Sequence, residues 1–270
     1  ISNQPSQLGD SNMTRSSNSR SLLYIGILAL VLLGSGFYWF FEIRDGETSQ
    51  TPTPSLATST PPPTPTPPIS SLIVGGGTET IVIATTGNPI TDFLNKINAL
   101  ALNPGETRKI VITSETKGAG DFTITDLLDR FLITYPAGLR PALGTDAAIL
   151  VFGQREAYTT KGQLDLAVSN QKRLIFLTEV RDPVALNAVL SSWETTLPDA
   201  LSAVLGLNKA KAAGTGFLIN NYGTINVRYR NFPYPDRSID HTIFTARNGK
   251  LYLLIAGSRE SALNSIDLLR

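Results

Sequence analysis

Hydrophobic and polar positions divide the chain into four stretches of different character. Residues 1–20 are almost entirely polar, residues 21–41 contain a long apolar run, residues 42–71 are rich in proline and threonine, and residues 72–270 alternate between short apolar and polar segments. A stretch with few large apolar side chains cannot bury a core and stays disordered. We therefore expect a disordered tail, a membrane span, a linker and one folded domain, in that order.

The apolar run at 22–41 has the length of a membrane span. It holds 20 residues without a charge, and at about 1.5 Å per residue such a helix spans roughly 30 Å, the hydrocarbon thickness of a bilayer. Arg15 and Arg20 precede the run, whereas acidic residues dominate the stretch after it. The positive-inside rule then places residues 1–20 in the cytoplasm and residues 42–270 outside. The sequence thus predicts a single-pass protein of the cell membrane that contacts lipid through residues 21–41.

A cleaved signal peptide is the competing interpretation of this segment. Residues 22–33 would form its apolar region, and the small residues 34–36 would form the cleavage site. The apolar run continues through residues 37–41, which favours an uncleaved anchor. Met13, the one methionine of the sequence, is a candidate translation start.

Proline and threonine dominate the predicted linker. Eight of the chain's 17 prolines lie within residues 51–70, interleaved with six threonines. Proline fixes φ and removes the amide donor, so neither helix nor sheet forms there. Polyproline II extends by about 3.1 Å per residue. We expect a disordered, semi-rigid stalk that holds the outer domain away from the membrane.

The spacing of apolar residues in the outer domain predicts both strands and helices. Short apolar runs predict buried strands at 80–85, 109–114, 147–152 and 173–178. Helical spacing predicts helices at 91–102, after Thr123, after Asp182 and after Thr196.

Local signals mark the helix that follows Thr123. Thr123 and Asp126 have capping-box spacing, and Pro136 is expected to end the helix. The residues predicted to face the core are Leu127, Leu128, Phe131 and Leu132.

Similar signals mark the two helices that follow the strand at 173–178. Asp182 and Pro183 match an N-cap and a first helical position. Thr196 and Asp199 have capping-box spacing, and Gly206 is placed to end the second helix.

The last part of the chain predicts a meander of antiparallel strands. Residues 224–230 alternate strictly between apolar and polar, as in a strand with one solvent-facing side. The segments 241–247 and 250–256 flank Asn248 and Gly249, a strong hairpin signal. Ser258 then caps a final helix. We predict an α+β (mixed α/β) extracytoplasmic domain with a C-terminal β-meander and a closing helix.

Composition excludes several functional classes. The chain has 23 basic and 22 acidic residues, without the clustered basic excess of a nucleic-acid binder. It has no cysteine, which excludes disulfides, thiolate metal sites and cysteine nucleophiles. Its one histidine, His241, leaves no poly-histidine metal site. We expect no cofactor, no metal and no nucleic-acid partner, and we assign no catalytic residue, so a binding role is favoured over an enzyme.

Two motif types could carry chemistry, but each lacks its partners. Residues 75–77 are three glycines that precede a strand and lack the Lys-Ser/Thr of a P-loop, which fits a flexible start of the domain. Ser114 with Lys117, and Ser169 with Lys172, match the S-x-x-K motif of penicillin-recognising enzymes, but the Ser-Asp-Asn and Lys-Thr-Gly motifs are missing.

Acidic residues and the histidine offer weaker catalytic candidates. Asp121, Asp126 and Asp129 could supply the paired carboxylates of a glycosidase, although capping accounts for Asp126. Asp240 precedes His241, but neighbours on a strand point to opposite faces. We therefore expect a surface histidine rather than a catalytic pair.

The segment 228–237 interleaves arginine with aromatic residues around two prolines. Arginine and tyrosine are enriched at binding hot spots, so we predict a contact surface for a partner or ligand. Core packing of the aromatic residues is the competing interpretation. The predicted contact residues are Arg228, Arg230, Tyr234 and Arg237.

Several segments of the outer domain resemble a known group of proteins. These are SWETTL at 192–197, NVRYRNFPYPD at 226–236, SID at 238–240 and AGSRES at 256–261. Together with the tail, span and Pro/Thr stalk, they make the chain similar to single-pass membrane proteins of small-genome bacteria of the candidate phyla radiation (Patescibacteria). The resemblance implies a location in the cell envelope and transfers no activity or site residue.

These observations predict a membrane-anchored extracytoplasmic module that binds a protein partner in the cell envelope. One alternative is an envelope hydrolase that acts on glycan or peptide through aspartates. A second is a small-ligand sensor coupled through the membrane helix, which would need a membrane partner because the tail is too short to hold an output domain.

Overall fold

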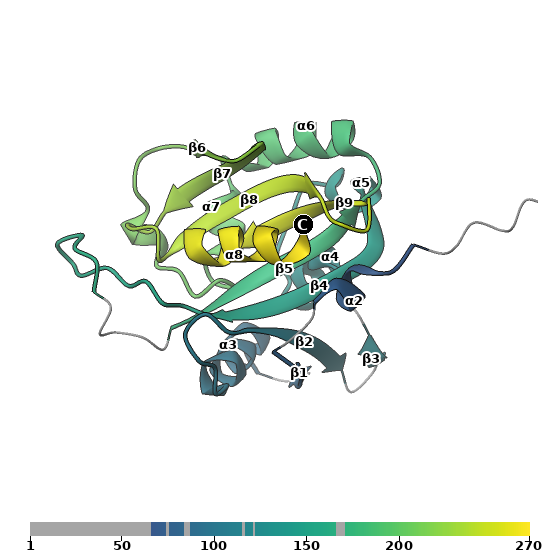
Figure 1. Cartoon of the computed structure of the whole chain (residues 1–270), viewed down its shortest axis with the longest axis horizontal. Helices are drawn as coiled ribbons and strands as arrows, with labels where there is room; N and C mark the ends of the chain where they lie inside the picture. Colours follow the sequence, from purple (N-terminus) through teal and green to yellow (C-terminus); the bar gives the residue numbers. More distant parts are fainter. Residues whose placement is uncertain (1–65, 74–75, 84–86, 115–116, 121, 166–170) are drawn as a thin grey trace, which may run out of the picture. The chain divides into compact units, whose positions relative to one another are not determined.

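The computed structural model describes residues 66–73, 76–83, 87–114, 117–120, 122–165 and 171–270 (Figure 1). The predicted tail, membrane span, signal-peptide alternative and most of the linker lie outside the described residues. In the part of the chain that is described, none of the helices has the length and hydropathy needed to cross a bilayer. Residues 64–270 form one compact unit.

A mixed β-sheet forms the centre of this unit. Eight strands follow the order β1-β2-β4-β5-β9-β8-β7-β6, and β3 pairs with β2, which makes nine strands among the described residues. β1 and β2 are parallel, and the remaining pairs are antiparallel. The strands are β1 (Thr78–Ile83), β2 (Thr107–Ser114), β3 (Lys117–Gly120), β4 (Leu143–Gly153), β5 (Lys172–Val180), β6 (Leu218–Tyr222), β7 (Ile225–Asn231), β8 (Ser238–Thr245) and β9 (Leu251–Ala256).

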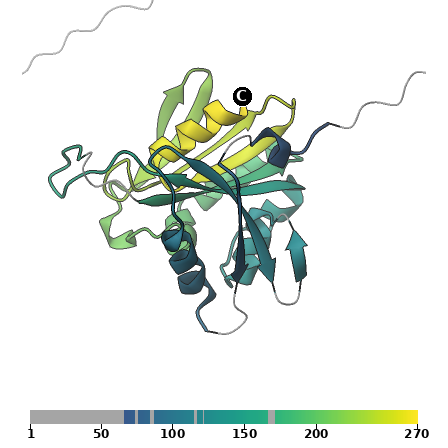
Figure 2. The same cartoon turned by 60° about the horizontal axis from the view of Figure 1, so that its bottom comes forward.

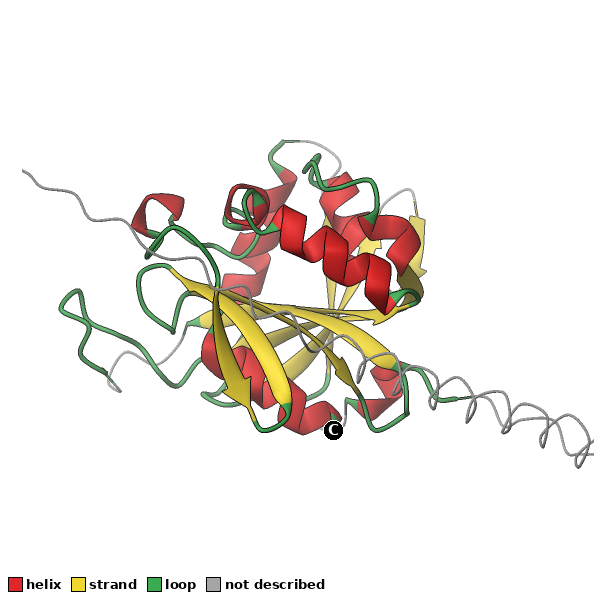
Figure 3. Cartoon of the chain, turned by 90° about the horizontal axis from the view of Figure 1, so that it is seen from above, coloured by secondary structure: helices red, strands yellow, loops and turns green. Residues whose placement is uncertain are grey.

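Helices cover both faces of the sheet, as seen from above in Figure 3. One face carries α3 (Pro89–Ala99), α4 (Ile124–Arg130), α5 (Leu139–Ala142), α6 (Pro183–Trp193) and α7 (Leu197–Leu201). The other face carries α2 (Ile69–Leu72) and α8 (Arg259–Leu269). A short 3₁₀ helix, Lys209–Lys211, follows α7.

The central strands are buried on both faces because their residues alternate between two cores. In β4, Ile149 and Val151 join the core beneath α3, α4 and α6, here called the α6-side core. Leu150 and Phe152 join the core beneath α2 and α8, the α8-side core. This alternation accounts for the continuous apolar runs of the central strands. The predicted α+β class, the C-terminal meander and the closing helix are confirmed.

Most of the predicted helix caps are present. The Thr123 and Asp126 capping box forms at the start of α4. Asp182 caps α6 with Pro183 in the first turn, and the Ser258 side chain accepts a hydrogen bond from the Ser261 amide at the start of α8. These caps stabilise the helix ends by roughly 1 kcal/mol each.

The capping box predicted for Thr196 and Asp199 is wrong. Thr196 does precede α7, but its side chain makes no cap bond to the helix amides. Its hydroxyl instead donates to the Trp193 carbonyl at 3.4 Å, because α6 and α7 are joined by a tight turn whose carbonyls also need donors.

Leu132 does not face the core, contrary to prediction. α4 ends at Arg130, well before Pro136. The Ile133 amide donates to the Leu128 carbonyl at 2.8 Å, the closure of a Schellman turn. This turn places Leu132 at φ 56°, in the left-handed position that usually holds glycine, and leaves it 91% exposed.

Contrary to prediction, the end of the linker forms a helix, because Ile69 and Leu72 of α2 pack into the α8-side core after the last linker proline, Pro68. Helix α2 is attached to the sheet through a partly buried carboxylate. The Ile69 amide donates to both carboxylate oxygens of Asp146 on β4, at 3.1 and 3.0 Å. Tyr252 on β9 donates its hydroxyl to the same carboxylate at 2.6 Å. Asn248 adds a bond from its side-chain amide to the Pro67 carbonyl at 2.9 Å. The first described residues are therefore fixed to the middle of the sheet.

Candidate functional site

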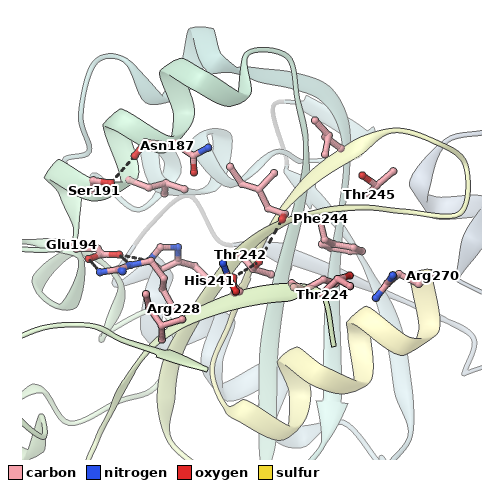
Figure 4. A pocket seen from close by; sticks show the side chains of 16 residues that line it. Asn187, Ser191, Glu194, Thr224, Arg228, His241, Thr242, Phe244, Thr245 and Arg270 are labelled. Carbon is pink, nitrogen blue, oxygen red and sulfur yellow. Dashed lines mark hydrogen bonds and ion pairs between the residues drawn. The ribbon is translucent and has the colours of Figure 1, made fainter. Parts of the chain in front are cut away.

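A hollow of about 580 Å³ lies between α6 and the part of the sheet that contains β7 and β8 (Figure 4). Its volume falls in the range of ~300–1,000 Å³ that is typical of ligand pockets. We call it the α6 hollow and treat it as the candidate site. The polar residues in its lining are Asn187, Ser191, Glu194, Thr224, Asn226, Arg228, His241, Thr242, Thr245 and Arg270.

The hollow opens where the ladder between β7 and β8 ends. The last residue pair of this ladder is Arg228 opposite His241, yet β8 continues to Thr245 and pairs there with β9. The Thr242 hydroxyl donates to the Asn226 carbonyl at 2.8 Å, so a side chain takes the place of the next backbone bond. The β6–β7 hairpin stands apart from the rest of the sheet at this point (Figure 2).

A contact at the tip of the β6–β7 hairpin shows toward which face of the sheet the hairpin separates from β8. Tyr222, at the end of β6, donates its hydroxyl to Asp267 on α8, at 2.9 and 2.7 Å from the two carboxylate oxygens. The tip is thus held on the α8 face of the sheet, opposite α6. The separation of the hairpin from α6 leaves the hollow.

Strand alternation decides which side chains face α6. Val227 of β7 belongs to the α8-side core, so the adjacent Arg228 points toward α6. On β8, Ile239 and Ile243 pack on the α6-side core, and His241 lies between them on the same face. Arg228 and His241 are therefore cross-strand neighbours beneath α6.

Both residues bind one carboxylate from α6. Glu194 follows the last turn of α6, and its Oε1 lies 3.0 Å from Nε2 of His241. Arg228 donates from Nε to Oε1 and from Nη2 to Oε2, the second at 2.5 Å. Two-point binding of this kind combines charge with fixed geometry. Figure 4 shows the three side chains together at one end of the hollow, with Arg270 at the other.

The Glu194 carboxylate is held in its ionised form. Burial by itself would raise its pKa, but the hydrogen bonds from His241 and Arg228 outweigh burial and lower the pKa to about 2. Its side chain is 12% exposed, whereas that of Arg228 keeps 38% exposure. The cluster thus presents a partly open guanidinium to the hollow and keeps the carboxylate covered.

His241 is not at the surface, contrary to prediction. It is 2% exposed, because α6 and Phe217 cover that face of β8, with the Phe217 ring centroid 5.3 Å from the imidazole. The prediction that Asp240 and His241 diverge is confirmed. Asp240 faces the α8 side, where it accepts a hydrogen bond from Ser238.

The four predicted contact residues do not gather in one patch. Arg228 lines the α6 hollow. Arg230 lies at a second hollow, where Nη2 donates to the Gly214 carbonyl at 2.9 Å. Tyr234 and Arg237 line a third hollow in the loop between β7 and β8.

Tyr234, which lines that third hollow, is held in place by its neighbours. Tyr234 stacks on Tyr158, with ring centroids 5.8 Å apart, and donates its hydroxyl to the Thr160 carbonyl at 3.0 Å. A Cβ at Gly162 would lie 2.9 Å from the Tyr234 ring. The ring packs against the loop of residues 158–162, so packing accounts for it.

The aspartates of the hydrolase alternative do not form a catalytic pair. Asp126 caps α4 and pairs with Arg140 at 3.4 Å. Asp129 is exposed, binds the same guanidinium and accepts a bond from Tyr135 at 2.8 Å. Asp121 lies outside the described residues.

The remaining motifs have structural explanations. Ser114 ends β2 rather than starting a helix, and Ser169 lies outside the described residues. Gly76 packs so closely on β2 that a Cβ would lie 1.6 Å from the Thr107 carbonyl oxygen, so at this position glycine permits close packing.

Glu194 is the site residue that the sequence reasoning missed. It continues the four-residue spacing of Leu186 and Leu190, both buried. An acidic residue at a position that continues the apolar face of a helix indicates a buried carboxylate, which needs hydrogen-bond or ion-pair partners.

A function for this chain has to be inferred from its geometry. No protein-family model, curated protein or solved structure matches this chain. Across the described residues, no group of three or more His, Cys, Asp and Glu side chains is arranged to hold a metal ion.

Proposed function

We propose that this chain is a membrane-anchored extracytoplasmic module that binds an extended, acidic segment of an envelope protein in the α6 hollow. The membrane anchor and the outward orientation come from the sequence. The observation that carries the binding role is the end of the β7–β8 ladder at Arg228 and His241, beside a hollow of about 580 Å³.

The strand edge supports an extended ligand. Beyond His241, alternate residues of β8 turn their amides and carbonyls toward β7, which no longer pairs with β8 there. A peptide strand can satisfy such groups, and its alternate side chains then enter the neighbouring hollow. The Thr242 hydroxyl bond to Asn226 is the contact that the peptide would replace first.

The charges of the lining support an acidic ligand. A guanidinium has five donor hydrogens, and Glu194 binds Arg228 only through Nε and Nη2. Donors therefore remain on a side chain that is 38% exposed. Arg270 adds a second guanidinium at the opposite end. Glu194 is the one carboxylate among the lining side chains, and its charge is already paired with Arg228.

The same geometry gives little support to acyl-transfer chemistry. A catalytic histidine needs a hydroxyl or thiol nucleophile within hydrogen-bond reach. The polar contact described for His241 is with Glu194, and Ser191 in the lining donates its hydroxyl to the Asn187 carbonyl at 2.8 Å. The His241 imidazole thus orders the cluster.

The test uses the full chain in detergent micelles and four fluorescent peptides of equal length. One is acidic, one neutral, one basic, and one is acidic with a central proline. We expect the acidic peptide to bind most tightly in fluorescence anisotropy, and the proline to weaken binding because it removes an amide donor. Arg228→Gln should weaken binding of the acidic peptide about tenfold or more, the loss of a charge-assisted hydrogen bond.

Arg108→Gln is the matched control. Arg108 also binds carboxylates, those of Glu106 and Glu79, but on β2, far along the sheet from β7. Its variant should bind the acidic peptide as the unchanged chain does. Equal binding of all four peptides, no binding of any, or equal affinity of the Arg228→Gln variant would contradict the proposal. Binding of small anions without peptide binding would favour the sensor alternative.

A further inference from the structure

β6 is an outer edge of the sheet, and its surface lacks the features that protect such edges. Among the described residues it pairs with β7 and with no other strand. Native edges are blocked by charges, prolines or bulges. The five residues of β6, Leu-Ile-Asn-Asn-Tyr, contain no charge and no proline, and their register with β7 runs without a shift.

Two large apolar side chains are exposed on this strand. Leu218 is 61% and Ile219 57% exposed, and they are adjacent, so they project to opposite faces. At the other end of the sheet, β1 carries Glu79, which pairs with Arg108 at 3.8 Å. The edge at β6 is the less protected of the two.

We propose that β6 pairs antiparallel with β6 of a second copy of this chain, across a two-fold axis at Asn220. Such pairing is isologous, since the same surface is used on both copies and each contact occurs twice, once on either side of the axis. Leu218 of one copy then lies opposite Tyr222 of the other, and Ile219 lies opposite Asn221. The sheet continues from one copy into the next.

The composition of the strand favours a second copy over another partner. Pairing of two identical strands brings any charge that they carry close to the same charge on the other copy, and like charges on neighbouring strands are destabilising. β6 has no charge to repel a copy or to select an oppositely charged strand. An aliphatic–aromatic pair, Leu218 with Tyr222, stabilises cross-strand contacts by roughly 0.2–1 kcal/mol. Tyr222 is already ordered by its bonds to Asp267 at 2.9 and 2.7 Å.

The proposed β6–β6 contact buries a small area, and this area determines how strongly we expect the two copies to associate. Stable dimers bury more than about 1,000 Å² in total, and a pairing of five-residue strands buries less. We therefore expect a weak, reversible dimer that forms at high local concentration, such as two copies in one membrane would have.

Single cysteines test the pairing directly, because the chain has none of its own. Directly opposite residues of an antiparallel pair have Cα atoms about 4.5–5.5 Å apart, within the range that a disulfide spans. Full-length Asn220→Cys, oxidised in detergent micelles, should form a disulfide dimer. Thr80→Cys, exposed on the opposite edge strand, reports random collisions. We expect about tenfold more dimer from Asn220→Cys, since pairing raises the effective concentration.

A mixture experiment fixes the register. Ile219→Cys mixed with Asn221→Cys should give a heterodimer in excess over either homodimer, because these residues face each other across the axis. Cross-linking of Asn220→Cys no faster than of Thr80→Cys would overturn the proposal, provided that circular dichroism shows both variants folded.

Charge variants give a second readout that does not depend on disulfide chemistry. Asn220→Lys and Asn220→Glu should each sediment as monomers, because like charges then meet at the axis, and an equal mixture should associate. Association of either variant alone to the same extent as the unchanged chain would also overturn the proposal. So would a mixture that stays monomeric while the unchanged chain dimerises.

Discussion

Arg228 and His241 lie directly opposite each other on neighbouring strands, and both bind the carboxylate of Glu194 from the helix above. This contact joins α6 to the last rung of the β7–β8 ladder. It places a covered carboxylate and a partly exposed guanidinium at the mouth of the α6 hollow. The arrangement makes the stability of this region depend on one charged group.

Glu194→Gln should destabilise the domain by about 1–3 kcal/mol, because it leaves the Arg228 charge without its partner. Urea unfolding of the full chain, followed by circular dichroism, measures this change. Asp129→Asn is the control, since Asp129 also binds an arginine, Arg140, but is 54% exposed. The control should cost less than about 0.5 kcal/mol. Equal losses of unfolding free energy in the two variants would contradict the prediction that the covered Glu194 pair contributes more than an exposed one.

Acid should weaken the same cluster. The pKa of Glu194 is lowered from 4.5 to about 2 by its partners, against the effect of burial. A carboxyl group whose pKa falls on folding contributes stability above its unfolded pKa, and loses that contribution as pH drops through the folded value. The difference in unfolding free energy between the unchanged chain and Glu194→Gln should therefore be constant above about pH 5 and shrink toward pH 2. A difference that does not change with pH would refute this assignment.

Asp240 should have the opposite pH dependence. Burial raises its pKa from 3.8 to about 7, while the Ser238 hydrogen bond and the nearby Arg259 act in the other direction. A carboxyl group with a raised pKa stabilises the fold below its unfolded value, and this contribution is lost as pH rises through the folded value. Asp240→Asn should be more stable than the unchanged chain at pH 8, by on the order of 1 kcal/mol or more, and the difference should vanish near pH 4. Thermal unfolding across this range measures it.

Leu132→Gly should stabilise the end of α4. Leu132 has φ 56° and is 91% exposed, so it adopts a conformation that suits glycine and buries little apolar surface. We expect a gain of about 0.5–1 kcal/mol in unfolding free energy. Leu132→Ala, which keeps the Cβ, should not show this gain. A loss of stability in the glycine variant would mean that the exposed leucine contributes through packing.

Asp146→Ala should release α2 from the sheet. The carboxylate binds the Ile69 amide at 3.1 and 3.0 Å and the Tyr252 hydroxyl at 2.6 Å. We expect a loss of roughly 1–3 kcal/mol, because these donors are left without an acceptor. Hydrogen exchange should accelerate most at residues 69–72. Tyr252→Phe, which keeps the Asp146 contact with Ile69, should leave exchange at residues 69–72 slow.

The parts of the fold that local chemistry determines can be predicted from the sequence. The central strands β4 and β5 carry continuous apolar runs because they are buried on both faces, and the caps at Thr123 and Asp182 depend on residues three positions apart. β6 was missed, since Leu218–Tyr222 has a weak pattern of its own and gains its structure from pairing with β7. Leu132 was misplaced because a Schellman turn overrides helical spacing.

The candidate site could be predicted only in part, because its contacts are distant in sequence. Arg228 was selected for its residue type and does line the α6 hollow. Its partner Glu194 is 34 residues away, and Glu194 and His241 are separated by 47. Only the placement of α6 over β7 and β8 brings them together, and no local spacing encodes that placement.

The attachment of α2 also determines how the domain would respond to mechanical load. A pull that arrives through residues 66–68 reaches the sheet at Asp146 on β4 and, through Asn248 and Tyr252, at the start of β9. β4 and β9 both pair with β5, in the interior of the sheet. These side-chain bonds therefore bear tension before it reaches β1, the edge strand that follows α2 in the chain. Resistance to forced unfolding is set by the unfolding rate, so the bonds that hold α2 are the first that a pull on residues 66–68 must break.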